Sequence, residues 1–308
     1  MIEIATAIAA LLVPVAIGAI AGRLRAFADP DAAIDVMNRV ALHVAFPALV
    51  IGSLSDPGTP IAHSPAFVAI VPVSLVIALA IARLAVRTDR AGTLALVIAF
   101  GNTAYLGLPF VAAVLGHDAL ATASVAVAIH VALAMTVGPA LLVRWGTGGG
   151  EGAGLGAIAR QPIVWSPLIG LALRALPPEV LGPLRAVLVP LGAMAAPHSM
   201  VLIGLYLFVH RSRLKADRDV IVHVAARLVL APAVTLALVL GARALGALTL
   251  TEARVLVVLA AMPTAITTFA IALERGIAPD RVASAIVAST VAAAITLPLA
   301  VAIAFALP

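Results

Sequence analysis

Residues 100–110 read Phe-Gly-Asn-Thr-Ala-Tyr-Leu-Gly-Leu-Pro-Phe inside a long apolar run. Pro109 lacks an N–H and frees the carbonyl of Tyr105, four residues earlier, while two glycines loosen the helix further. Asn102 and Thr103 bring polar groups to the same depth. Non-helical backbone inside a membrane persists only where it is buried in protein or lines a water-filled cavity. We therefore predict a broken helix here.

A second stretch has the same character. Residues 260–269 read Ala-Ala-Met-Pro-Thr-Ala-Ile-Thr-Thr-Phe, and Pro263 frees the carbonyl of Leu259. We predict that the two stretches are broken helices that cross near the membrane centre; two kinked but continuous helices, packed by small residues, are the alternative. Both prolines suit the first position of a half-helix. We expect four N–H groups to face an anion, those of Phe110, Val111, Thr264 and Ala265.

The composition predicts an all-α integral membrane protein. Of 308 residues, 63% are hydrophobic and 11% charged, whereas soluble domains carry about 25% charged residues. The charges fall between apolar runs of about 18–25 residues, each long enough to cross a bilayer. The remaining length holds no folded extramembrane domain, which excludes a conventional soluble enzyme. We place ten transmembrane helices at 2–22, 34–54, 64–86, 93–116, 119–144, 162–176, 184–209, 219–242, 254–275 and 281–306.

The loop charges predict the orientation. Fourteen of the 19 basic residues fall in alternate loops on one side, which the positive-inside rule makes cytoplasmic. Both termini should then be periplasmic. One Lys against 18 Arg suggests GC-rich codons, and we expect a multi-pass protein of a bacterial inner membrane. The absence of cysteine excludes disulfides and thiolate chemistry.

The chain reads as two related halves. Seven of the twelve residues in 145–156 are glycine, which is typical of a linker. Pro-Ala-Leu-Val-Ile-Gly at 47–52 parallels Pro-His-Ser-Met-Val-Leu at 197–202. Five spans per half is an odd number, so the second half should insert upside down, as in many secondary transporters. The predicted parts are a first repeat, a Gly-rich cytoplasmic linker and a second repeat, at 1–144, 145–161 and 162–308.

These residues carry a resemblance. Gly-Asn-Thr-Ala-Tyr-Leu-Gly-Leu-Pro at 101–109 is similar to the fourth-span signature of the auxin efflux carrier family, which includes plant PIN proteins and bacterial malonate- and malate-type permeases. Residues 44–49 and 260–276 resemble its second and ninth spans. The resemblance implies a five-plus-five inverted repeat with crossing helices 4 and 9, the bile-acid-symporter or PIN-like fold, and carriage of small organic anions. Thr267 stands where many relatives have Asn, which leaves the substrate open.

The expected cargo is anionic, because no carboxylate falls at the midplane, where a cation carrier normally places one. We expect the substrate to bind around the crossing. The candidate residues are Asn102, Thr103, Tyr105, Pro109, Phe110, Pro263, Thr264, Thr267, Thr268, Pro47, His43, His198 and Ser199.

Two further residues are candidates for proton or anion coupling. Arg227 lies about 12 Å into its span at 1.5 Å per residue; it either snorkels to the cytoplasmic headgroups or pairs with an anion or a carbonyl. His130 is either a packed core residue or a proton carrier. No spacing suggests a metal site or a catalytic constellation, and we expect no cofactor.

The leading function is a secondary transporter of small organic anions with alternating access around the helix 4/9 crossing. A sodium-coupled bile-acid-type symporter is the first alternative. A non-transporting membrane sensor or an intramembrane enzyme is the second. The expected partners are a small organic anion and the lipid bilayer, with a homodimer left open and no nucleic acid.

Overall fold

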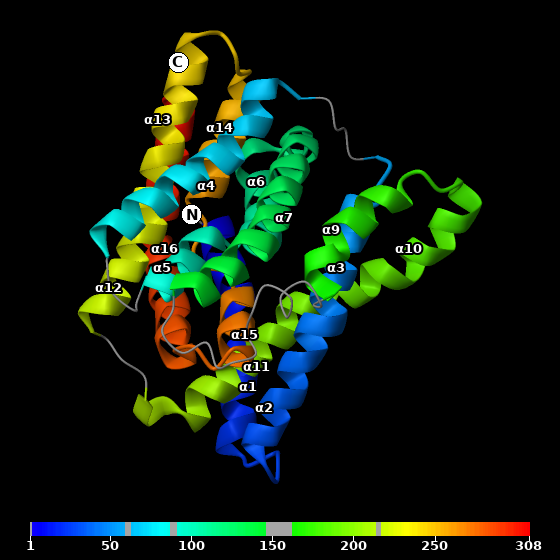
Figure 1. The fold of residues 1–308 in the computed structure, drawn as a ribbon, viewed down its shortest axis with the longest axis vertical. Coiled ribbons are helices and arrows are strands. Elements are labelled where there is room, and N and C mark those ends of the chain that lie inside the picture. The colour runs from blue at the N-terminus through cyan, green and yellow to red at the C-terminus, as the bar shows by residue number, and fades with distance from the viewer. Residues whose placement is uncertain (1, 59–62, 87–90, 146–161, 214–216) are drawn as a thin grey trace.

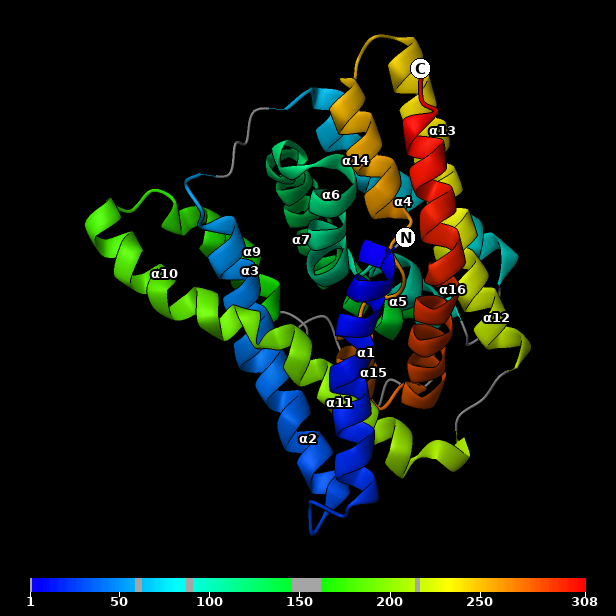
Figure 2. The same cartoon turned by 180° about the vertical axis from the view of Figure 1, so that it is seen from behind.

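The computed structural model describes residues 2–58, 63–86, 91–145, 162–213 and 217–308, and the named elements within these ranges are all helices (Figures 1 and 2). The Gly-rich linker lies outside them except for Trp145. In chain order the elements are α1 (Ile2–Arg23), α2 (Pro30–Val40), η1 (Ala41–Ala45), α3 (Phe46–Leu54), α4 (Pro65–Ala85), α5 (Ala91–Ala99), η2 (Thr103–Gly107), α6 (Leu108–Leu115), η3 (His117–Ala119), α7 (Leu120–Trp145), α9 (Pro162–Leu173), α10 (Pro178–Ala193), α11 (Ala195–Val209), η4 (Arg211–Arg213), α12 (Arg218–Ala225), η5 (Ala226–Leu230), α13 (Ala231–Ala244), α14 (Leu250–Ala260), α15 (Thr267–Glu274) and α16 (Pro279–Phe305).

The helices are those of a multi-pass membrane protein. Five helical stretches in the described ranges are long and apolar enough to span a bilayer: Pro30–Gly52, Pro65–Ala85, Pro178–Val209, Arg218–Ala244 and Pro279–Phe305. Large apolar side chains face outward along them, for example Ile295, which is 78% exposed. Such a surface suits lipid and not water. Two of these stretches begin before the spans that we placed at 34–54 and 184–209.

A single wide helical turn precedes each of three prolines. The π-helical segments η1, η2 and η5 each end two residues before a proline, which is Pro47, Pro109 or Pro232. A proline ring clashes with the carbonyl four residues earlier and offers that carbonyl no N–H. A π turn pairs residues five apart and takes up the mismatch without ending the helix. The chain therefore bends at these prolines and continues.

The contacts divide the helices into two bundles. The first, which we call the scaffold bundle, holds α1, α2, η1, α3, α9, α10, α11 and η4; the second, the crossing bundle, holds the remaining helices (Figures 1 and 2). Each bundle draws on both halves of the chain. Glycine permits close packing in the scaffold, because a Cβ on Gly18 would lie 2.0 Å from the Val201 carbonyl oxygen and one on Gly204 would lie 2.0 Å from that of Val15.

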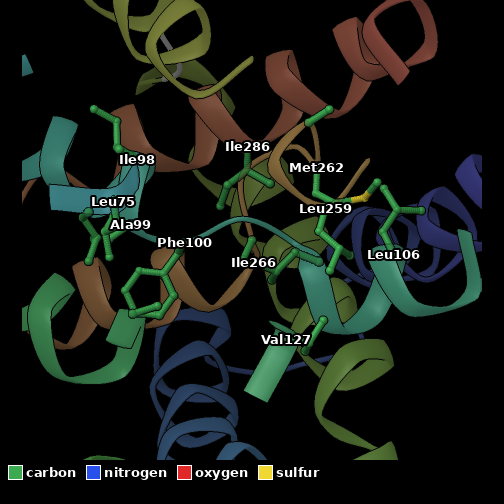
Figure 3. Packing of buried hydrophobic residues seen from close by; sticks show 14 of the residues in the cluster. Leu75, Ile98, Ala99, Phe100, Leu106, Val127, Leu259, Met262, Ile266 and Ile286 are labelled. Carbon is green, nitrogen blue, oxygen red and sulfur yellow. The ribbon is translucent and has the colours of Figure 1, made fainter. Parts of the chain in front are cut away.

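Two helices of the crossing bundle are interrupted. The helix of α5 stops at Ala99 and resumes at Thr103, and that of α14 stops at Ala260 and resumes at Thr267. The prediction of broken helices is confirmed at both stretches, and continuous helices are excluded. Apolar side chains from both interruptions gather around the crossing (Figure 3), among them Phe100, Leu106, Leu259, Met262 and Ile266.

Candidate functional site

The two interrupted segments pair with each other through their backbones. The N–H of Asn102 donates to the carbonyl of Pro263 at 2.7 Å, and the N–H of Ala265 donates to that of Phe100 at 2.8 Å, on either side of an antiparallel bridge between Gly101 and Thr264. This pairing gives unwound backbone the partners that lipid cannot supply. It also joins the two broken helices rigidly at one point.

This pairing corrects one of our expectations. Thr264 and Ala265 do not present free N–H groups to an anion, because the first donates to Ser289 Oγ at 3.2 Å and the second to Phe100. Pro263 lies in the extended segment, and α15 begins only at Thr267. The second half-helix after α5 likewise begins at Thr103, one π turn before Pro109. Its first turn therefore lies at residues 103–105, nearer the crossing than predicted, and the N–H of Thr103 already donates to the carbonyl of Gly101 at 2.7 Å.

Arg227 reaches the crossing from the other side. It leaves η5 with its guanidinium buried (3% exposed) and donates from Nε to the carbonyl of Met262 at 2.9 Å. Its two terminal nitrogens donate to the carbonyls of Ile98 at 3.0 Å and Ala260 at 3.1 Å. The snorkelling interpretation is wrong. A carbonyl cluster at the ends of two half-helices is a stronger partner than distant headgroups, since it satisfies the guanidinium inside the protein.

His130 contacts the same point from α7. The N–H of Gly101 donates to His130 Nε2 at 3.2 Å. Because Nε2 accepts, the neutral ring carries its proton on Nδ1. A second proton on Nε2 would break the bond to the N–H of Gly101, so protonation of His130 and this contact with the crossing backbone exclude each other.

Several buried polar atoms at the crossing have no partner within the described part of the chain. They are Asn102 Oδ1, Thr103 Oγ1 and Thr264 Oγ1, on residues that are at most 4% exposed. Buried polar groups in folded proteins are nearly always hydrogen-bonded. Unpaired polar atoms of this kind mark candidate positions for a polar ligand or water.

Cavities lie on both sides of the crossing. The crossing cavity has about 380 Å³ of empty space between Phe46 and Leu49 of the scaffold bundle and Asn102, His130 and Thr267 of the crossing bundle. An adjoining cavity of about 430 Å³ continues between α3 and the helices α6 and α7. A rear cavity of about 540 Å³, partly open to solvent, lies inside the crossing bundle. Its polar lining residues are Arg227, His130, Thr103, Ser74 and Thr235.

The remaining candidates of the ninth and fourth spans lie close to this site. Thr267 lines the crossing cavity, and Thr268 turns its hydroxyl back to the carbonyl of Ala265 at 2.5 Å. Phe110 is buried in the apolar core of α6. For Tyr105 and Pro109 the structure describes the backbone alone.

The candidates on the second and seventh spans do not meet the crossing. His43 is exposed and bonds to the carbonyl of Arg39 at 3.1 Å. His198 joins two scaffold helices by bonding to the carbonyl of Met37 at 2.8 Å. Pro47 and Ser199 are buried in the scaffold bundle but line none of the three cavities.

Sequence reasoning missed two residues at the site. Gly101 has no room for a side chain, because a Cβ there would lie 2.2 Å from an Arg227 terminal nitrogen. Phe46 lines the crossing cavity from the scaffold bundle. The glycine was visible in the 101–109 motif, but its neighbour Arg227 lies more than a hundred residues away, and no local pattern links them.

The described residues include no cluster of three or more His, Asp or Glu side chains that could hold a metal ion.

Comparison with known proteins gives one finding. No curated protein matches the chain significantly. A family model described as "Membrane transport protein" matches residues 3–150 and 155–301, two segments that meet in the Gly-rich stretch. The match covers nearly the whole chain, so the protein is a membrane transporter and not an enzyme. The chain belongs to the membrane transport protein family of auxin efflux carriers.

Proposed function

We propose that this protein is a secondary active transporter of small organic anions, which bind in the crossing cavity. The observation that carries the proposal is the unpaired Oδ1 of Asn102, which lines the crossing cavity beside Thr267; the unpaired hydroxyl of Thr103 belongs to a residue of the rear cavity instead. Leaving a buried amide or hydroxyl unpaired costs about 1–3 kcal/mol. A carboxylate accepts from N–H and O–H groups that line the cavity, and a water bound with it donates to Asn102 Oδ1, which is an acceptor.

The charges around the crossing favour an anion. Arg227 holds a permanent positive charge behind Gly101, and the half-helix that begins at Thr103 points its positive end toward the crossing cavity. None of the described residues that line the three cavities is acidic. The carbonyls that hold Arg227 offset its charge, so the helix end at Thr103 is the feature that favours a carboxylate in the crossing cavity.

Contacts between the bundles support alternating access. On one side of the crossing the bundles are joined, since Asn38 Nδ2 donates to the carbonyl of Ala270 at 3.2 Å and Tyr206 Oη donates to Asp280. On the other side the crossing cavity and the adjoining cavity lie between α3 and the helices α6 and α7, although α7 also contacts α3 and α9. We interpret this as an outward-facing state in which Tyr206 and Asp280 form the inner gate.

The packing also supports an inverted repeat of ten spans, with halves at 1–144 and 162–308. In the scaffold bundle α1 packs on α11 and α9 packs on α3, so the first helix of each half contacts the second span of the other half. Two repeats related by a twofold axis in the membrane plane produce this exchange of partners.

Topology follows from the same arrangement. The α1–α2 and α15–α16 connections and the end of α11, which lie near many of the basic residues, are in the lower part of Figure 1, whereas the end of α3, the start of α4 and the α13–α14 connection are in the upper part. We propose that the lower end is cytoplasmic and that both termini are periplasmic, in a bacterial inner membrane. An impermeant maleimide should label Leu245→Cys in intact cells but Leu24→Cys only after permeabilisation. The reverse pattern would overturn the orientation.

The test of function uses purified protein and proteoliposomes. A thermal-shift screen with mono- and dicarboxylates should identify anions that raise the melting temperature, because a ligand that binds only the native state stabilises it by mass action. A stabilising anion should then be taken up by proteoliposomes and compete with its radiolabelled form. If neither mono- nor dicarboxylates stabilise or cross the membrane, the organic-anion proposal is wrong.

A further inference from the structure

The ends of two half-helices converge on Arg227. The α5 helix ends at Ala99 and the α14 helix at Ala260, and the guanidinium bonds to carbonyls of Ile98, Ala260 and Met262 at 2.9–3.1 Å. Each helix C-terminus carries a partial negative charge of about half an electron, concentrated on its last carbonyls. Together the two ends present roughly one negative charge at the membrane centre, and one guanidinium balances it.

This position is the one where a coupling cation is expected. In transporters with discontinuous helices, unwound carbonyls and half-helix C-termini coordinate sodium or receive protons. Here the same kind of carbonyl cluster is present, and a side chain of the protein already occupies it. The rear cavity adds the hydroxyl-bearing residues Ser74 and Thr235 and about 540 Å³ of empty space beside the guanidinium.

The backbone is shaped around this guanidinium. A Cβ on Gly101 would lie 2.2 Å from one terminal nitrogen of Arg227 and 2.8 Å from its central carbon. Because Gly101 has no side chain, the planar guanidinium can lie directly against its Cα. A loosely held surface arginine does not need such a seat, and the fit indicates a fixed component of the site.

We propose that Arg227 is a tethered cation that takes the place of a coupling metal ion at the helix crossing. The protein therefore binds its cargo without sodium, and removal of the guanidinium turns the carbonyl cluster into a site for a small monovalent cation. Without the Arg227 side chain, the carbonyl cluster should bind a free guanidinium ion more tightly than an alkali ion, because the three carbonyls match the planar fork of N–H donors. The claim about coupling rests on the proposed transport function; the claim about the cation site does not.

The experiment measures cation binding directly and needs no transport substrate. Purified wild-type, Arg227→Ala and Arg254→Ala proteins are melted with guanidinium chloride at 0 to about 20 mM, far below denaturing concentrations, and separately with sodium, potassium or choline chloride at constant ionic strength. Arg254 is the matched control, since its Nε also donates to a carbonyl, that of Ala304 at 3.3 Å, away from the crossing.

We expect guanidinium to raise the melting temperature of Arg227→Ala saturably, by about 2–4 °C, and sodium to raise it less, with choline inert. The wild-type and Arg254→Ala proteins should show no saturable rise with any of these cations. An Arg227→Ala protein that folds and responds to none of them would overturn the proposal.

The wild-type protein provides a second measurement if Arg227→Ala does not fold. Its melting temperature should be equal in sodium, potassium and choline chloride, because the cation site is already filled. A saturable stabilisation of the wild type by sodium would mean that a metal ion still binds at the crossing, and the proposal would be wrong. Absence of any anion response would refute the transport proposal alone, so the two failures are distinguishable.

Discussion

Substitution of Gly101 by alanine tests whether the guanidinium seat stabilises the protein. The new Cβ would lie 2.2 Å from one Arg227 nitrogen, more than 1 Å inside ordinary van der Waals contact. The guanidinium has to move, and its bonds to the carbonyls of Ile98 and Ala260 lengthen or break. Hydrogen bonds to a charged group contribute about 1.5–3 kcal/mol each, and overpacking adds about 1–3 kcal/mol.

These contributions are upper limits, because a shifted guanidinium keeps part of its hydrogen bonding; we expect Gly101→Ala to destabilise the protein by about 3–5 kcal/mol, in the range found when a buried charge loses its partners. The assay is the melting temperature in detergent, which should fall by roughly 6–20 °C if each kcal/mol is worth about 2–4 °C. Gly182→Ala is the control, because no atom lies within 4 Å of a Cβ there, and alanine favours the helix. Equal melting temperatures for Gly101→Ala and the wild type would refute the reasoning.

The other predictions concern the site, the gate and one helix start. Asn102→Ala should weaken binding of a stabilising anion about 5- to 150-fold by calorimetry, and Thr267→Ala less, since it loses one hydroxyl rather than an amide; unchanged affinity in both would remove the crossing as the site. Tyr206→Phe should shift the equilibrium constant between outward- and inward-facing states away from the outward-facing state about five-fold. Val131→Cys in the adjoining cavity should then react more slowly with maleimide, and unaltered labelling contradicts the gate. Glu252→Ala, which removes acceptors for two backbone N–H groups, should lower the melting temperature with anion affinity retained; an unchanged melting temperature would argue against a capping role.

The interruptions could be predicted because their causes are local. Pro109 and Pro263 remove hydrogen bonds at fixed distances along the chain, and glycine and threonine nearby make an unwound segment tolerable. The exact start of each half-helix could not be predicted, because a π turn before Pro109 and extended backbone after Pro263 satisfy the same local chemistry in two ways. The contact with the other interrupted segment decides which of these two forms occurs.

The role of Arg227 depends on tertiary contacts that no local pattern encodes. A basic residue eight positions into an apolar span suits both a snorkelling and a buried side chain, and the choice depends on carbonyls from two other helices. The same holds for His43 and His198, whose matching positions in the two halves suggested a shared site. The structure turns one outward and uses the other to join α2 to α11.

The pairing of α1 with α11 has a consequence for biogenesis. The groove at Gly18 is filled by a helix that emerges from the ribosome about 190 residues later, which takes roughly 10–40 s at 5–20 residues per second. During that interval α1 lies in the bilayer without α11, the helix on which it packs, and α3 likewise lacks α9. Quality-control proteases and insertion chaperones thus encounter a half-assembled scaffold bundle. Mutations that widen the Gly18 or Gly204 contact should lower the amount of protein in the membrane more than the activity of the protein that does assemble.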